Sequence, residues 1–237
     1  MATFGYWVLD ADPGKGFTNA QPPPRQEVWR EGEAVRLIKA AWRHDYRGLA
    51  ACLAVAWDTQ LSPIDARTLK LSQLHRDPVS AYFKLARAKT GRGAIGTLSP
   101  RADRVLRDYL EATVSNGIGD APIFRNRSGR PYSKDTLGDD FRDIRARVFG
   151  AGERRQMADF RRTGTVEALA GGVDPETLSS KMANSLLQSN FLHKTYAPVQ
   201  LVRVRDTDAA RKRGRSRLRD HGANAGAGNW NNNRTKV

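Results

Sequence analysis

The chain has 237 residues and 39% hydrophobic content, which is enough for one large domain or two small ones around a buried core. Forty lysines and arginines against twenty-five acidic residues give a net charge of +15, which favours a polyanionic partner, nucleic acid first. The single cysteine, Cys52, excludes an internal disulfide and a cysteine cluster for zinc. No apolar run approaches the roughly 20 residues that span a bilayer, and the N-terminus lacks the order of a secretory signal. We therefore expect a cytoplasmic protein that uses no membrane and no metal.

The first 200 residues contain a tether and then a series of helices. Residues 1–26 are rich in glycine and proline and end in three prolines, which predicts a stiff linker. Apolar residues at helical spacing follow over 34–41 and again over 49–57, which predicts two antiparallel core helices. Ser62, followed by Pro63 and an acid in the first turn, is typical of a capped helix start.

A hairpin and two more helices follow. Residues 81–97 read as two short strands around the glycine-rich turn 89–93. A helix is predicted over 105–110, and Ser133 is expected to cap another helix with its apolar face at 137–148. The predicted fold class is therefore mainly α with a small β-hairpin or sheet, an α+β arrangement over residues 27–200.

Basic side chains gather on the hairpin, in a polar loop and near the C-terminus. Residues 201–237 combine a basic run with a Gly/Asn-rich end, which predicts a disordered nucleic-acid-binding tail. We expect phosphate contacts from Arg92, Arg125, Arg127, Arg130, Lys134, Arg211, Lys212 and Arg213. Plain solvation of these charges is the alternative interpretation.

The stretch 158–198 carries the most specific pattern. It opens with Phe160-Arg161-Arg162-Thr163, continues with an apolar helix that ends at two glycines, and closes on Thr195-Tyr196. Together with Lys89 on the hairpin, this order of elements resembles the catalytic half of a tyrosine recombinase of the phage-integrase family. The resemblance covers the predicted domain and implies a duplex DNA partner, a homo-oligomer on DNA and no cofactor.

The resemblance also implies roles for single residues. Arg161 would bind the scissile phosphate, and Lys89 would protonate the leaving 5′-oxygen. Tyr196 would attack that phosphate to form a 3′-phosphotyrosine. The sequence departs from the family pattern at Ser62, Ala158 and Asn184, where the family has an arginine, a histidine, and a histidine or tryptophan. An amide cannot act as a base near neutral pH, so Asn184 could only donate a hydrogen bond.

Other groups are candidates to cover for the missing ones. His193 lies three residues before Tyr196 and would share its face in one helical turn. Arg162, Arg67 and Arg92 are the other auxiliary candidates.

Three functions stay open at this stage. The first is a divergent recombinase that cleaves and rejoins DNA, and the second is a recombinase-fold protein that binds DNA without cutting it. The third is a basic structural or regulatory protein unrelated to recombinases. The presence of Lys89, Arg161 and Tyr196 in the order of the family favours the first two functions. Since about 26 residues precede the first core helix, the helical domain that usually precedes the catalytic one is expected to be missing, removed or supplied by another chain.

Overall fold

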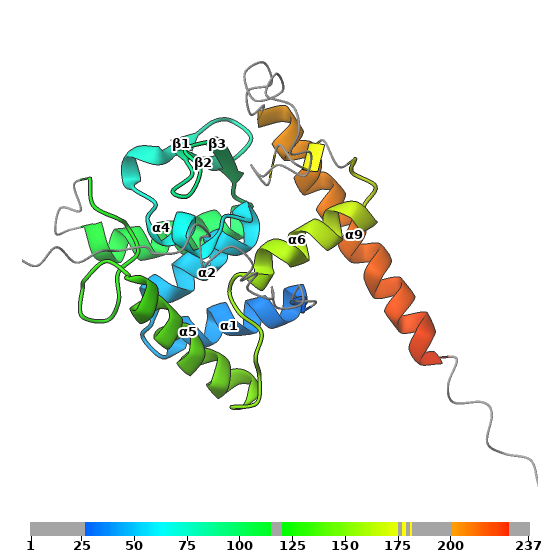
Figure 1. Ribbon diagram of the computed structural model, residues 1–237, viewed down its shortest axis with the longest axis horizontal. Coiled ribbons are helices and arrows are strands. Elements are labelled where there is room, and N and C mark those ends of the chain that lie inside the picture. The colour runs from blue at the N-terminus through cyan, green and yellow to red at the C-terminus, as the bar shows by residue number, and fades with distance from the viewer. Residues whose placement is uncertain (1–26, 115–119, 175–176, 179–180, 182–200, 228–237) are drawn as a thin grey trace, which may run out of the picture.

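The computed structural model describes residues 27–114, 120–174, 177–178, 181 and 201–227 (Figure 1). In this part the fold is mainly helical, with a three-stranded antiparallel sheet in the order β1-β2-β3. The helices are α1 (Glu31–Arg43), α2 (Arg47–Thr59), α3 (Pro63–Arg67), α4 (Pro100–Val114), α5 (Lys134–Phe149), α6 (Asp159–Ala170) and α9 (Leu201–Ala227). The strands are β1 (Leu74–Arg76), β2 (Ala81–Ala86) and β3 (Gly93–Thr97).

Helix α2 lies at the centre of the molecule because it is apolar on almost every side. Its residues from Gly48 to Trp57 are all buried. Helices α1, α4, α5 and α6 and strand β3 all contact it. Such all-round burial is typical of a helix that forms the middle of a core. Cys52 lies in this helix with no exposed surface, and burial raises the pKa of its thiol to about 12. Cys52 is therefore a core residue.

The sheet packs directly against the C-terminal end of α2. Strand β2 alternates buried and exposed residues, with Phe83 and Leu85 inward and Lys84 outward. A side chain at Gly96 on β3 would meet Thr59, since an added Cβ there would lie 2.6 Å from the Thr59 Cβ. The hairpin of β2 and β3 was predicted from the sequence, whereas β1 was not.

Two predicted helix caps are present. The Ser62 side chain accepts a hydrogen bond from the Asp65 backbone N–H at 3.3 Å, and the Ser133 side chain accepts one from the Thr136 N–H at 3.1 Å. Each hydroxyl satisfies a backbone donor that the first helical turn leaves unpaired.

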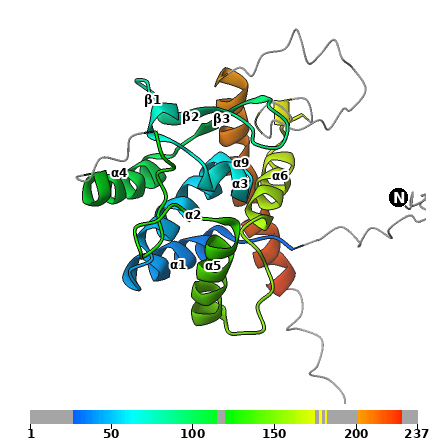
Figure 2. The ribbon, with the colours of Figure 1, turned by 60° about the vertical axis from the view of Figure 1, so that its left-hand side comes forward.

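The C-terminal segment differs from the prediction of a disordered tail over 201–237. Residues 201–227 form α9, which lies along α6 in both views (Figures 1 and 2). The helices come very close, because a Cβ on Gly171 would lie 1.8 Å from the Ala210 carbonyl oxygen and one on Gly214 would lie 1.9 Å from the Glu167 oxygen. The prediction was wrong for this segment because Val204, Ala210 and Gly214 form a buried stripe of small residues among exposed basic ones.

Among the helices of the described residues, none combines the length and apolar character needed to cross a membrane.

Candidate active site

Arg161 projects from the first turn of α6 onto the C-terminal end of α2. Its Nη1 donates a hydrogen bond to the Gln60 carbonyl oxygen at 2.9 Å. Gln60 ends α2 in the left-handed conformation, with φ of 59°, and its side chain occupies the space beside Gly164. Burial and, to a smaller extent, the positive charge of Arg87 lower the pKa of Arg161 to about 10, against the opposing effect of Asp65. The guanidinium therefore stays charged at neutral pH, within a partly desolvated site.

Asp65, in α3, is the centre of the site. One carboxylate oxygen, Oδ2, accepts from the Ser62 hydroxyl at 2.6 Å and from Arg87 Nε at 3.0 Å, while Oδ1 accepts from the Ala88 N–H at 2.9 Å. Burial raises the pKa of this carboxyl, but the hydrogen bonds from Ser62, Ala88 and Arg87 outweigh it and the pKa is lowered. Asp65 is thus ionised and ties the turn between β2 and β3 to α3.

Lys89 follows the tethered Ala88 in the hairpin turn. The turn is closed by hydrogen bonds from the Arg87 N–H to the Arg92 oxygen and from the Gly91 N–H to the Arg87 oxygen, both at 2.8 Å. Gly91 has a φ of 65°, which glycine adopts without strain. The Lys89 side chain is exposed. The fold therefore brings the backbone that carries Lys89 to the same acid that influences Arg161, although the two residues are far apart in the sequence.

Three predicted site residues, Tyr196, His193 and Asn184, lie outside the described residues. Their roles stay predictions.

Among the positions that depart from the family pattern and lie within the described residues, Ser62 has a structural role. Ser62 caps α3 and also donates to Asp65. Ala158 is the N-cap residue of α6 and makes no side-chain cap bond. Arg67 donates from Nη1 to the Tyr132 carbonyl oxygen at 3.2 Å, which directs its guanidinium toward Tyr132. Arg162 is half-buried on α6.

The basic loop before α5 is held against the core. A Cβ on Gly48 of α2 would lie 1.9 Å from the Arg125 carbonyl oxygen, so the loop backbone touches the start of α2. Arg125 donates to the Gly129 oxygen at 3.0 Å, and the Arg127 guanidinium lies 4.1 Å from the Tyr46 ring centroid. Two further cations of this region, Arg130 and Lys134, are exposed, and Arg92 on the hairpin is half-buried.

Arg211 does not fit the phosphate contact predicted for it. The residue is 2% exposed, and its Nε donates to Glu167 Oε2 at 3.2 Å. Its Nη1 and Nη2 donate to the carbonyl oxygens of Asp58 and Trp57 at 3.0 and 3.1 Å. These bonds fasten α9 to the end of α2, so the side chain is part of the core. Its neighbours Lys212 and Arg213 are exposed.

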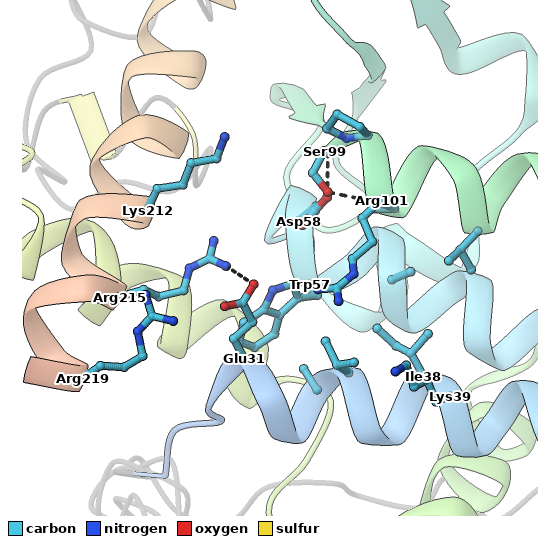
Figure 3. A pocket seen from close by; sticks show the side chains of 16 residues that line it. Glu31, Ile38, Lys39, Trp57, Asp58, Ser99, Arg101, Lys212, Arg215 and Arg219 are labelled. Atoms are coloured by element: carbon cyan, nitrogen blue, oxygen red, sulfur yellow. Dashed lines mark hydrogen bonds and ion pairs between the residues drawn. The ribbon is translucent and has the colours of Figure 1, made fainter. Parts of the chain in front are cut away.

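A separate cavity of about 530 Å³ lies between α1, α2, α4 and α9 (Figure 3). Trp57 and Ile38 supply apolar walls, and Arg215 pairs with Glu31 at 2.8 Å across one side. None of the residues that line it belongs to the site around Asp65. Within the described ranges, no group of three or more His, Cys, Asp or Glu side chains could hold a metal ion.

Several solved structures share the fold. XerA recombinase matches with a TM-score of 0.55 and 20% identity, over 67% of this chain and 56% of that one. The XerH site-specific recombinase in a pre-cleavage complex with its difH substrate matches with a TM-score of 0.56 and 10% identity, over 67% of this chain and 47% of that one. The catalytic core of lambda integrase gives 0.51 and 16%, over 66% of this chain and 91% of that core.

These likenesses define the class of the fold: the chain has the fold of a tyrosine-recombinase catalytic domain. It spans about half the length of the XerA and XerH chains that it matches. No protein-family model matches the sequence, and neither does any curated protein.

Proposed function

We propose that the chain is a site-specific recombinase or integrase that binds duplex DNA, and that it cleaves and rejoins a strand through a 3′-phosphotyrosine at Tyr196. The observation that carries this proposal is the meeting of α6, which bears Arg161, with the hairpin that bears Lys89, around Asp65. The shared fold with XerA recombinase and the lambda integrase core supports it.

The proposed reaction exchanges one phosphate ester for another. The Tyr196 hydroxyl gives up its proton, for which His193 is the candidate base, and its oxygen attacks the phosphorus. The bond to the 5′-oxygen breaks, and the ester energy is kept in the phosphotyrosine until the strand is rejoined. Arg161 would neutralise charge on the non-bridging oxygens, which grows in the transition state. Lys89 would give a proton to the leaving 5′-oxygen. No group outside the chain and the DNA is needed to balance this exchange.

Phosphate contacts from the basic loop would hold the duplex. Arg127, Arg130 and Lys134 are exposed there, and the loop is positioned by its contact with α2. Such contacts recognise the backbone of DNA and release counterions, so affinity for duplex DNA should fall steeply with salt. We expect the chain to act as a homo-oligomer on its DNA.

Tyr196→Phe tests the proposal because it keeps the aromatic ring and removes the nucleophile. The probe is a pool of nicked duplexes with randomised sequence around the nick, so that the short fragment with the free 5′-hydroxyl is lost after cleavage and a covalent protein–DNA adduct accumulates. We expect the unmodified chain to form the adduct, Tyr196→Phe to form none, and His193→Ala to form less. Tyr82→Phe is the matched control, because Tyr82 lies on β2 against His75, 5.5 Å between ring centroids.

An adduct from the Tyr196→Phe protein would refute the assignment of the nucleophile. The second candidate function is DNA binding without cleavage, which one observation favours. The position of the missing arginine holds Ser62, whose hydroxyl is used by the cap and by Asp65. Salt-dependent duplex binding with no adduct from the unmodified chain would establish this second function.

A further inference from the structure

Arg87 occupies a well-defined place at the end of β2. Its backbone is held on both sides of the turn, because its N–H donates to the Arg92 oxygen at 2.8 Å and its oxygen accepts from the Gly91 N–H at 2.8 Å. Its side chain is only 11% exposed, unlike the exposed Lys89 two residues later. An arginine side chain buried to this degree at a hairpin turn is held in one orientation by its surroundings.

The Arg87 guanidinium lies beside Ser62. Both side chains donate to the same atom, Asp65 Oδ2, at 3.0 Å for Arg87 Nε and 2.6 Å for the Ser62 hydroxyl. The guanidinium therefore reaches the first turn of α3, which is the position where the sequence has lost an arginine. It arrives there from the hairpin instead of from α3.

The same guanidinium acts on Arg161. Its positive charge is one of the causes that disfavour the charged form of Arg161, and Asp65 acts in the opposite direction. Two like charges influence each other in this way only when they are close and poorly screened by water. Two guanidiniums therefore interact with the same carboxylate, Asp65: Arg87, just beyond β2, by a hydrogen bond and Arg161, on α6, through its charge.

This arrangement suits a phosphodiester. Guanidinium groups bind phosphate oxygens by paired, charge-assisted hydrogen bonds, which are stronger in a partly desolvated site. An anion placed between Arg87 and Arg161 would also relieve their mutual repulsion. Asp65 would keep Arg87 oriented through Nε while the phosphate binds.

We propose that Arg87 is a second phosphate-binding guanidinium of this site and supplies the charge that is absent at Ser62. The assignment rests on the proposed function, because the phosphate in question is the one that Tyr196 would attack. Asp65 is then a positioning residue, which holds Arg87 and the backbone of the hairpin turn in place.

Arg87→Gln tests the proposal through binding of inorganic phosphate to the full chain, at ionic strength held constant with chloride. We expect the dissociation constant for phosphate to rise roughly tenfold or more, since charge-assisted hydrogen bonds are lost. Arg76→Gln is the matched control. It removes one positive charge from the same sheet, where Arg76 is exposed and pairs with Asp103 at 2.9 Å. Equal phosphate affinities in Arg87→Gln and Arg76→Gln would overturn the proposal.

A second measurement needs no substitution. In the unmodified chain, the Nε–H resonances of Arg87 and Arg161 should both shift during a phosphate titration followed by ¹⁵N NMR. An Arg87 resonance that does not move while that of Arg161 does would also overturn the proposal, even if Arg87→Gln failed to fold.

The adduct assay separates this proposal from the proposed function. On the randomised nicked duplexes, we expect Arg87→Gln to lower the rate of adduct formation about a hundredfold, the typical loss for one group that stabilises developing charge. If Arg87→Gln forms adduct as fast as the unmodified chain, strand cleavage stands and the role of Arg87 is refuted. If the unmodified chain forms no adduct and Arg87→Gln still weakens the binding of phosphate, cleavage is refuted and Arg87 remains a phosphate-binding residue.

Discussion

Two clusters of arginines contact the same end of α2 and differ in their balance of charge. At the contact of α6 with α9, Arg211 and Arg215 pair with Glu167, Glu31 and Asp208, and Lys181 also pairs with Asp208. Three carboxylates there face two guanidiniums and one ammonium group. At the hairpin, Arg87 pairs with Asp65, and the charges of both residues influence Arg161.

Arg211 and Arg161, the central arginines of the two clusters, both have side chains largely removed from solvent. Arg211 is 2% exposed and bonds to Glu167 and to two carbonyl oxygens, so its donors are used within the protein. Arg161 donates to the Gln60 carbonyl oxygen and is repelled by the guanidinium of Arg87. Burial alone therefore does not separate Arg211 from Arg161, the arginine that we propose to bind a phosphate.

Of the changes considered, deleting residues 201–237 should reduce the stability of the protein most. The deletion removes the buried side chains of Val204, Ala210 and Arg211 and exposes the face of α6 on which they pack. We expect the melting temperature to fall sharply, measured by circular dichroism. An unchanged melting temperature would show that the contact of α6 with α9 adds no stability and that the segment serves only as a basic arm.

Arg211→Met should have the next largest effect. The substitution fills a similar volume but removes the Arg211 donors from the buried Glu167 carboxylate and two carbonyl oxygens, and Glu167 keeps Arg215 at 3.6 Å. We expect the free energy of unfolding in urea to fall by about 3 kcal/mol. Arg213→Met, at an exposed position on the same helix, is the control and should change it by less than about 0.5 kcal/mol. A similar loss in both variants would contradict a structural role specific to Arg211.

The pH dependence of the free energy of unfolding should have opposite signs for Asp65 and for Glu167. Each effect should be smaller than that of Arg211→Met. The pKa of Asp65 is lowered from its usual 3.8, because its hydrogen bonds outweigh burial, so the folded state binds this proton less tightly than the unfolded chain. Its contribution is present above that value and is lost as pH falls. Burial raises the pKa of Glu167 above its usual 4.5 despite Arg211 and Arg215, so its contribution is present at low pH and is lost as pH rises.

Urea unfolding between about pH 3 and pH 7 measures these slopes. Asp65→Asn should remove a loss of stability on acidification, and Glu167→Gln should remove a loss that occurs as the solution becomes less acidic. Slopes that change in the same direction in the two variants would contradict the difference between the clusters.

Much of the fold could be predicted from local sequence patterns. The helices around 34–57, the β2–β3 hairpin and the caps at Ser62 and Ser133 follow from periodicity and capping chemistry that extend over a few residues. Helix α9 was missed because the residues it buries are small or polar and lie among arginines, so composition outweighed spacing. Its burial depends on the close approach of α6 at Gly171, which no local pattern reports.

The site was predicted in part. Arg161 and Lys89 were identified from a family pattern, and the structure brings the segments that carry them together. Arg87 was missed because its partner Asp65 is 22 residues away in the chain and the contact requires the hairpin to fold back on α3. The alternation of inward and outward residues along β2 could not predict the burial of Arg87, since Arg87 lies just beyond the end of the strand. Arg211 was misassigned because its bonds to Glu167, Asp58 and Trp57 span even longer separations.

The carbonyl groups at the C-terminal end of α2 connect the two clusters. The carbonyl groups of a helix terminus carry about half a negative charge. Here that charge is shared between Arg161, at Gln60, and Arg211, at Trp57 and Asp58. If Arg161 binds a phosphate as proposed, that binding and the docking of the C-terminal helix involve the same dipole. By thermodynamic reciprocity, any effect of an anion at Arg161 on the packing of α9 is then matched by an equal effect of α9 on the binding of the anion.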